Sequence, residues 1–438
     1  MTSKYKSESH ILSDRNSELM SKNYNNLYIN DDTFNNTLYT DLVMVKESLD
    51  YFPISTPQTH TMYFGLEKYV SQKLPVIDVK KAIENGCRIE IHGIYPLYFN
   101  ENMRLLGYKI LNDVEFYHIP YKKKLNFIRP RFYWGVNKIG KKVLLVAVTP
   151  GQDYIYHYAA IIRHFIYMHT GRYDNLITIH RYPLIENRIS DWTRLSSFIS
   201  RNDRVIIGYV DEIQKFIGDK LYRYISCTHE NEFYISTKYK LPHSNKVVNF
   251  LGVKFSFWGC ISTKIIDTIC QIGAEEVIYI AKLGCLTSPD DLYNKIFSPT
   301  NYITMKYNNV LKRICDVQNN FVKMFPQLNT NIHISVPTVL EEDLVLRKAA
   351  YELGASTIDN EISKIANTIS IFNNENNTNI GFAPIHFATD YIRNEDDSHF
   401  TTHIGLHNNR DIINRQKKYK ILENIANKVW CYLNTGAS

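Results

Sequence analysis

The chain has 438 residues, of which 44% are hydrophobic and 22% charged, and its formal net charge at pH 7 is +7. This composition is typical of a globular protein with a sizeable core, and it excludes a fully disordered, collagen-like or membrane-embedded chain. No stretch approaches about 18 apolar residues, so no transmembrane helix is expected. At roughly 150 residues per domain, the length predicts two or three domains.

The N-terminal residues and the cysteines together predict a cytoplasmic protein. The N-terminal residues are polar and lack the apolar run of a secretory signal. None of the seven cysteines forms a Cys-x-x-Cys pair, and an odd, dispersed set indicates reduced thiols in a cytoplasmic protein rather than a disulfide framework. They are Cys87, Cys227, Cys260, Cys270, Cys285, Cys315 and Cys431. The mild positive charge permits anionic small molecules but does not require them.

The first 200 residues divide into two parts. Residues 1–50 are rich in Ser, Asn, Asp and Lys and predict a flexible polar arm. Residues 51–200 predict an α/β domain of unknown role, in which the continuous apolar run 143–148 is typical of a strand buried on both faces. The other expected elements are strands at 88–94 and 176–179 and helices at 156–168 and 191–199, the last with Asp191 as N-cap.

Residues 201–438 repeat the alternation of strands and helices. Strands are expected at 204–208, 233–239, 247–257, 276–280, 332–336 and 380–388. Helices are expected at 263–272, 308–325, 340–353, 360–372 and 411–433, with a surface loop at 373–379. This order predicts an α/β fold with a mixed, mostly parallel sheet flanked by helices, preceded by a second α/β domain at the N-terminus.

Chemistry-bearing residues follow four of the expected strands. Ligands of such sheets bind at the carboxyl ends of the strands, so these segments are expected to form one site. The segments contain Gly208 with Asp211 and Glu212, then Tyr279 with Lys282 and Gly284, then Asp359-Asn360-Glu361, and finally Asp390.

The order and spacing of these segments resemble the purine nucleoside phosphorylase and methylthioadenosine nucleosidase superfamily. Its glycine-loop motif resembles Val277–Leu286, its ribose motif resembles Ile358–Glu361, and its Ser-Asp motif resembles Thr389-Asp390. The resemblance covers residues 203–438. It implies a nucleoside phosphorylase-like fold, an enzyme that cleaves or transfers at the N-glycosidic bond of a purine nucleoside or nucleotide, and a homodimer completing the site.

The resemblance also assigns roles at the sugar and the base. Breaking an N-glycosidic bond places negative charge on the leaving base, so an acid must protonate it, and Asp390 takes that role. Glu361 would accept hydrogen bonds from both ribose hydroxyls. Asn360 stands where the family has a methionine packed against the sugar, which leaves the identity of the sugar open.

The attacking group is less defined by the sequence. Tyr279 stands where the phosphorylases have a phosphate-binding arginine, and a phenol cannot replace a guanidinium fork. Lys282 can still hold an anion as a point charge. Gly208, Tyr279 and Gly284 are expected to join it in binding the base or an anion. Phosphorolysis is therefore disfavoured against hydrolysis. Glu212, and after it Asp211, are the candidates to activate water.

Other interpretations remain open. Asp359-Asn360-Glu361 can cap a helix, Asp390 can be an ordinary turn acid, and the two acids after Gly208 can begin a solvated helix. The domain can also be a non-hydrolysing nucleotide-binding or regulatory module, or the same scaffold recruited for biosynthetic chemistry on another small molecule.

Three further sequence patterns give weaker indications of function. His399, His403 and His407 have helical spacing, but Gly405 and two threonines disfavour a metal-binding helix, and neither a metal nor a cofactor is expected. The basic, aromatic segment 101–150 is more typical of a solvated hairpin than of a nucleic-acid surface. Residues 149–153 follow a buried strand as a ligand loop would, without a nucleotide-binding fingerprint. A small nucleoside or nucleotide is thus the expected partner, with no membrane and no nucleic acid.

Overall fold

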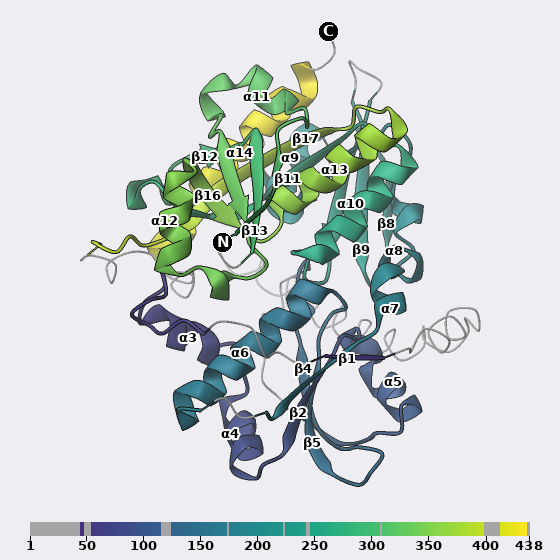
Figure 1. Ribbon diagram of the computed structural model, residues 1–438. Helices are drawn as coiled ribbons and strands as arrows, with labels where there is room; N and C mark the ends of the chain where they lie inside the picture. The colour runs from purple at the N-terminus through teal and green to yellow at the C-terminus, as the bar shows by residue number, and fades with distance from the viewer. Residues whose placement is uncertain are drawn as a thin grey trace, which may run out of the picture. The chain divides into compact units, whose positions relative to one another are not determined.

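The computed structural model describes residues 44–47, 54–114, 124–172, 175–221, 224–241, 246–306, 309–397 and 412–435. Residues 44–438 form one compact unit that contains two β-sheets (Figure 1). Most of the predicted arm 1–50 and the histidines at 399, 403 and 407 lie outside the described residues. The exception is strand β1 (Val45–Glu47), which pairs with the first sheet instead of belonging to an arm.

The first sheet has the order β1-β6-β2-β5-β4-β3. Its strands are β2 (Arg88–His92), β3 (Lys109–Val114), β4 (Arg131–Val136), β5 (Lys142–Ala147) and β6 (Ile177–Arg181). β2 pairs in parallel with β5 and β6, whereas the outer pairs are antiparallel. The apolar run that predicts a doubly covered strand is β5, which is buried after its first residue. The helices of this part are α3 (Gly65–Ser71), α4 (Val76–Glu84), α5 (Phe99–Leu105) and α6 (Gln152–Thr170).

The second sheet has the order β14-β13-β15-β16-β11-β7-β10-β9-β8, with β17 beside β11 and β12 beside β17. Its strands are β7 (Arg204–Gly208), β8 (Ile225–Glu230), β9 (Tyr234–Lys240), β10 (Val247–Val253), β11 (Glu276–Cys285), β12 (Ile296–Phe297), β13 (Asn301–Lys306), β14 (Asn309–Ile314), β15 (Ile332–Ser335), β16 (Ala355–Asp359) and β17 (Gly381–Tyr391). In the described part of the chain, parallel and antiparallel pairs are equally frequent. The sheet is mixed as expected but not mostly parallel, because hairpins extend both ends and because β11–β16 and β12–β17 are also antiparallel.

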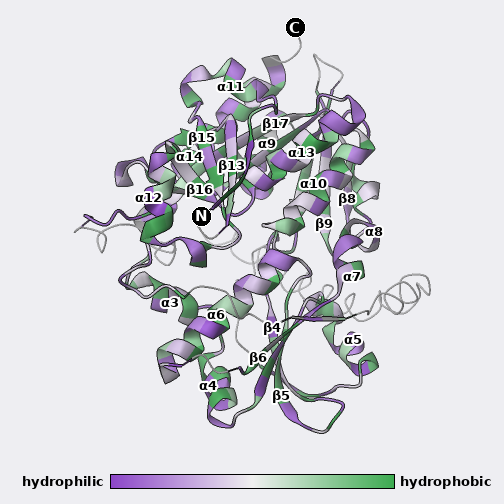
Figure 2. Cartoon of the chain, viewed as in Figure 1, coloured by the Kyte–Doolittle hydropathy of each residue, from purple (hydrophilic) through white to green (hydrophobic). Residues whose placement is uncertain are grey.

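Amphipathic helices flank this second sheet. They are α9 (Val210–Leu221), α10 (Cys260–Ile272), α12 (Leu344–Glu352), α13 (Ile362–Asn376) and α14 (Ile412–Thr435), with the shorter α7 (Pro183–Asn187), α8 (Ile189–Trp192) and α11 (Asn320–Met324). Figure 2 shows hydrophobic and hydrophilic residues alternating around α10 and α13, as expected of helices that bury one face. The expected end of the first of these helices at residue 272 is confirmed, since α10 ends at Ile272 and Gly273 after it is left-handed with φ of 86°.

Three predicted elements are wrong. The expected helix 308–325 is strand β14 followed by α11, because the backbone of β14 pairs with β13 while its side chains stay mostly exposed. The expected helix 191–199 breaks at Arg194, which has φ of 57°, and Asp191 lies inside α8 rather than at its N-cap. The expected loop 373–379 is mostly helical, since α13 continues to Asn376 and ends where Asn377 is left-handed.

The strands divide between the two sheets after β6 and before β7, which is where the sequence predicts a domain boundary. The two parts also contact each other directly. Asp153 at the start of α6 forms a 2.5 Å ion pair with Lys364 of α13, and the His157 ring lies 2.6 Å from the Thr338 hydroxyl. The independence of the two domains therefore stays a prediction. None of the described helices has the length and apolarity needed to cross a membrane, and none of the seven cysteines forms a disulfide.

Candidate functional site

Two adjacent parallel strands of the second sheet, β11 and β17, carry several of the predicted site residues. β11 extends past the expected Ile280 to Cys285, so Tyr279, Lys282 and Gly284 all lie on this strand. β17 runs parallel to it and places Asp390 directly beside Gly284. The register between the strands shifts at this point, where β17 gains one residue. A bulge of this kind re-aims a side chain at the end of a strand.

Asp390 is a buried carboxyl group, 8% exposed, that accepts a 2.8 Å hydrogen bond from the Thr389 hydroxyl. Burial raises its pKa to about 6, although Lys282 acts in the opposite direction. Gly284 leaves the necessary space, because a Cβ there would lie 3.1 Å from Asp390 Oδ2. The result is a carboxyl group that holds a proton up to nearly neutral pH.

Asp359 organises the second acidic segment. At the end of β16 its carboxylate lies 2.8 Å from His333 Nε2 and accepts hydrogen bonds from the backbone N–H groups of Glu361 and Ile362. Although burial raises its pKa, His333 dominates and the pKa is lowered overall. The helix-capping interpretation is therefore right for Asp359, which caps α13.

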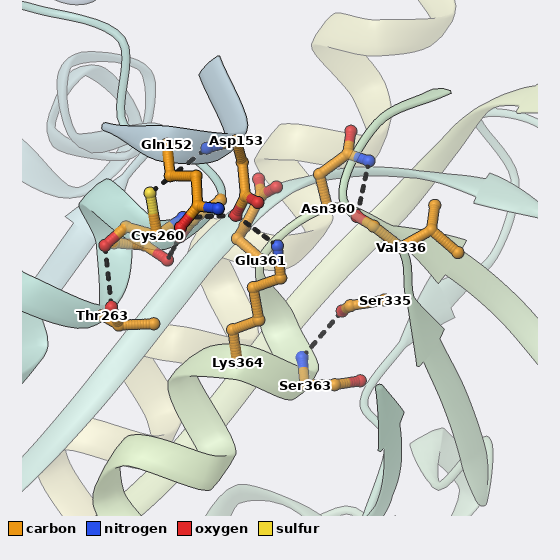
Figure 3. A network of polar contacts seen from close by, with 12 residues as sticks. Gln152, Asp153, Cys260, Thr263, Ser335, Val336, Asn360, Glu361, Ser363 and Lys364 are labelled. Carbon is orange, nitrogen blue, oxygen red and sulfur yellow. Dashed lines mark hydrogen bonds and ion pairs between the residues drawn. The ribbon is translucent and has the colours of Figure 1, made fainter. Parts of the chain in front are cut away.

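Glu361 is not the capping group. It accepts a 2.6 Å hydrogen bond from the Tyr279 hydroxyl, and its own side chain makes no cap hydrogen bond. Burial, and next the charge of Asp359, raise its pKa well above the usual range, against the influence of Lys364. Asn360 donates a 3.0 Å hydrogen bond to the Val336 carbonyl, as Figure 3 shows.

Residues from the first part of the chain reach this segment. In Figure 3, Asp153 and Cys260 lie next to Lys364 and Glu361. Asp153 accepts from Lys364 Nζ and, at 2.8 Å, from the backbone N–H of Cys260. The loop 149–153 noted in the sequence thus ends in a residue that holds α13 in place. Its partner Lys364 could not be identified from the sequence, because the two are separated by 211 positions.

Sequence reasoning also missed Glu342 and His386. Glu342 is fully buried, and its pKa is raised well above the usual range by burial and then by the charges of Asp390 and Asp359. His386 is buried beside the Tyr279 ring, with a centroid distance of 4.9 Å, and among the described residues neither of its nitrogens has a hydrogen-bond partner. Burial lowers its pKa to about 3. Neither residue belongs to a motif, so only the fold could reveal them.

Asp211 and Glu212 lie in the first turn of α9. Both side chains are half-buried. The pKa of Asp211 is raised, mainly by burial and secondly by the negative charge of Glu212. Glu212 lies 4.0 Å from Lys418 of α14, and the Lys418 ammonium lies 4.4 Å from the centre of the Tyr209 ring. The acids therefore begin a helix, as one interpretation held. Burial raises the pKa of the neighbouring Tyr209, which the charges of Lys282 and Glu212 influence in opposite directions.

Gly208 has a backbone conformation that residues with a side chain rarely adopt. Its φ is 103°, and a Cβ would lie 2.0 Å from the Ile280 carbonyl oxygen. We expect Gly208→Ala to lower the free energy of unfolding by roughly 3 kcal/mol, through backbone strain and this collision. Chemical unfolding measures the effect. The matched control is Gly218→Ala in α9, where a Cβ meets nothing within 4 Å; it should leave stability unchanged or raise it. An equal effect at both positions would contradict the turn at Gly208.

The predicted residues thus fall into two groups. Tyr279 holds Glu361, whereas Lys282 and Gly284 accompany Asp390. Since side chains alternate along a strand, Tyr279 and Lys282 point to opposite sides of β11. No direct contact joins Glu361 to Asp390 in the described residues, and Glu342 is the group influenced by both Asp390 and Asp359. Convergence of the two carboxyl groups on one ligand stays a prediction.

Comparison with known proteins gives one relative and several structures. "Oxidoreductase cns1" of the fungus Cordyceps militaris is 25% identical over 394 residues, which cover 86% of this chain and 49% of that protein. The chain therefore spans about half the length of the curated relative that it matches. No protein-family model matches.

The similar structures cover about half of this chain. An MTA/SAH nucleosidase has a TM-score of 0.38 and 13% identity, covering 54% of this chain and 97% of its own. The 5'-methylthioadenosine nucleosidase of Arabidopsis thaliana has a TM-score of 0.38 and 12% identity, with the same coverage. A futalosine hydrolase mutant of Helicobacter pylori has a TM-score of 0.39 and 12% identity, covering 53% of this chain and 99% of its own. These scores are too low to decide the fold family, and the proposals below rest on the geometry.

Proposed function

We propose that the chain is an enzyme that cleaves or transfers at the N-glycosidic bond of a purine nucleoside or nucleotide. The observation that carries the proposal is Asp390, a buried carboxyl group at a strand end whose pKa is raised to about 6. Such a group can donate a proton to the leaving base near neutral pH, and general acids of this kind contribute about 10²–10⁴-fold to the rate. Thr389 orients the carboxyl through its hydroxyl.

Lys282 is the exposed cation beside this acid. Its ammonium would attract an anionic part of the substrate, such as a phosphate or carboxylate, as a point charge. Tyr279 stands where the phosphorylases have a phosphate-binding arginine, and its buried hydroxyl, which donates to Glu361, has no positive charge to offer a phosphate. This arrangement favours hydrolysis, or a substrate with its own anionic group, over phosphorolysis.

Glu361 is proposed to accept hydrogen bonds from the sugar hydroxyls, which would replace the Tyr279 hydroxyl as donors. We expect Glu361→Gln to lower kcat/KM by about 10- to 100-fold, because the amide keeps only one oxygen to accept hydrogen bonds from the sugar hydroxyls. Tyr279→Phe is the matched variant, because it removes the competing donor and keeps the carboxyl group, so it should retain more activity. Steady-state kinetics of both variants test this role. Unchanged kinetics of Glu361→Gln would exclude Glu361 from the site.

The proposal is tested with the purified full chain and a panel of purine and pyrimidine nucleosides and their 5'-phosphates. Chromatography should detect free base from at least one purine compound, with or without phosphate or another acceptor. No free base from any compound would discard the proposal. Thermal stabilisation by a nucleotide without turnover would instead support the non-hydrolysing binding module.

A second candidate function is other small-molecule chemistry on the same scaffold. It is favoured by the relative described as an oxidoreductase, whose match covers 86% of this chain. Incubating the chain with the same panel and with NAD or NADP separates the two candidates. A change in cofactor absorbance without release of base would favour this second function.

A further inference from the structure

The first sheet contains a cluster of metal-ligating residues that is separate from the site above. Glu90 and His92 are two residues apart on β2 and therefore point to the same side of the sheet. His180 on the parallel strand β6 is the direct register partner of His92. His92 and His180 lie at the carboxyl ends of their strands, where sheets of this kind bind ligands, and Glu90 lies at the middle of β2.

The donor atoms of the three side chains converge. Glu90 Oε2 lies 3.3 Å from His180 Nε2 and 3.7 Å from His92 Nε2, and the three donor atoms all lie within 4.8 Å of one another. Two ligands of a tetrahedral ion with bonds of about 2.1 Å are about 3.4 Å apart. The observed separations from the carboxylate are close to that value, and the two stacked rings would have to turn out of their parallel arrangement for both Nε2 lone pairs to point at one cation.

The cluster is buried, and the Nε2 atoms of its two histidines lack hydrogen-bond partners among the described residues. Glu90, His92 and His180 are 5%, 0% and 5% exposed. Within the described chain, neither Nε2 atom makes a hydrogen bond of ordinary geometry, although both face the carboxylate. The two rings are stacked, with a centroid distance of 4.3 Å. Buried polar atoms without a partner are costly, and a bound ion would satisfy both nitrogens at once.

Two tyrosine hydroxyl groups outside the cluster contact its side chains and hold them in position. The Tyr182 hydroxyl lies 2.8 Å from His92 Nδ1, so the opposite nitrogen, Nε2, faces the carboxylate. The Tyr108 hydroxyl donates a 2.7 Å hydrogen bond to Glu90 Oε2. Partners of this kind orient ligating imidazoles and carboxylates in metalloproteins.

We propose that Glu90, His92 and His180 bind one divalent first-row transition-metal ion, zinc or ferrous iron. Two imidazoles and one carboxylate are the donor set of open catalytic zinc sites and of non-haem iron sites, whereas magnesium and calcium prefer oxygen ligands alone. Three protein ligands leave a coordination position for water or a substrate. The first part of the chain would then be a metal-binding module and not only a support for the second.

The full chain is first stripped with a chelator and then incubated with Zn²⁺, anaerobic Fe²⁺ or Mg²⁺. After desalting, metal analysis should find about one ion per chain for zinc or iron and essentially none for magnesium. The preference between zinc and iron identifies the ion. Failure of the wild-type chain to retain either ion would overturn the proposal, whatever the behaviour of any variant.

Variants locate the ion. His180→Asn should weaken binding by at least about 100-fold, and Tyr182→Phe by about 10-fold, because the latter only orients His92. Two controls should bind as the wild type does, namely His164→Asn, another buried histidine, and His229→Asn, an exposed one. If His180→Asn retains the ion with unchanged affinity, the cluster is a buried polar network and the ion binds elsewhere.

Discussion

Replacing Asp390 by asparagine is expected to reduce the release of free base by at least about 100-fold. Asparagine has nearly the same shape but no proton to transfer to the leaving base. Its matched control is Thr389→Val, which removes the 2.8 Å hydrogen bond to the carboxyl and leaves the acid in place; it should cost far less. Single-turnover rates at saturating substrate measure both variants. If Asp390→Asn retains wild-type turnover, another group is the acid.

The raised pKa of Asp390 also predicts how the stability of the protein changes with pH. The pKa of Asp390 is raised from 3.8 to about 6, so the folded protein binds the proton more tightly than the unfolded chain does. Stability should therefore fall as pH rises from about 4 to 6, by about 3 kcal/mol at most. Asp390→Asn should remove this loss and be at least as stable as the wild type at pH 7.5. Chemical unfolding at pH 5 and pH 7.5 tests this. Activity should likewise decline above pH 6.

Replacing Arg204 by methionine is expected to lower the free energy of unfolding by about 3–5 kcal/mol. Arg204 and Glu276 are register partners at the starts of β7 and β11. The guanidinium donates to Glu276 Oε2 at 2.8 and 3.1 Å, and both residues are almost fully buried. The Tyr432 hydroxyl of α14 donates to the other carboxylate oxygen. Removing the arginine leaves a buried carboxylate without its cation.

The double variant Arg204→Met with Glu276→Met is the control for this ion pair. Replacing both partners by apolar side chains removes the unpaired charge, so most of the lost stability should return. Urea unfolding of the three proteins gives the coupling between the two positions. A loss below about 1 kcal/mol in Arg204→Met would show that the pair is open to water and that β7 and β11 do not begin in this register.

The sequence predicts the strands well where burial dictates the residue type. β5 and β7 consist of short continuous apolar runs after a first basic residue, and their positions follow from that pattern. The sequence does not predict β14, because most of its side chains are exposed and show no alternation of apolar and polar residues. The backbone hydrogen bonds to β13 decide where this strand lies. Edge strands of this kind carry little information in their side chains.

The site is predictable only in part. Motif spacing predicts Glu361 and Asp390 as site residues, but it cannot tell that Asp359 caps α13 while Glu361 bonds to Tyr279. Glu342 is brought near the other acids by the fold and belongs to no motif. The metal-ligating cluster is hidden for the same reason, since His180 joins Glu90 and His92 from a strand nearly 90 positions away.

The most direct measurement is a crystal structure of the chain with a non-cleavable adenosine analogue. The account predicts that a ring nitrogen of the base lies within about 3.2 Å of the Asp390 carboxyl. It also predicts that the ribose hydroxyls replace Tyr279 as the hydrogen-bond donors to Glu361. An analogue bound elsewhere, or one that contacts only one of the two carboxyl groups, would contradict it.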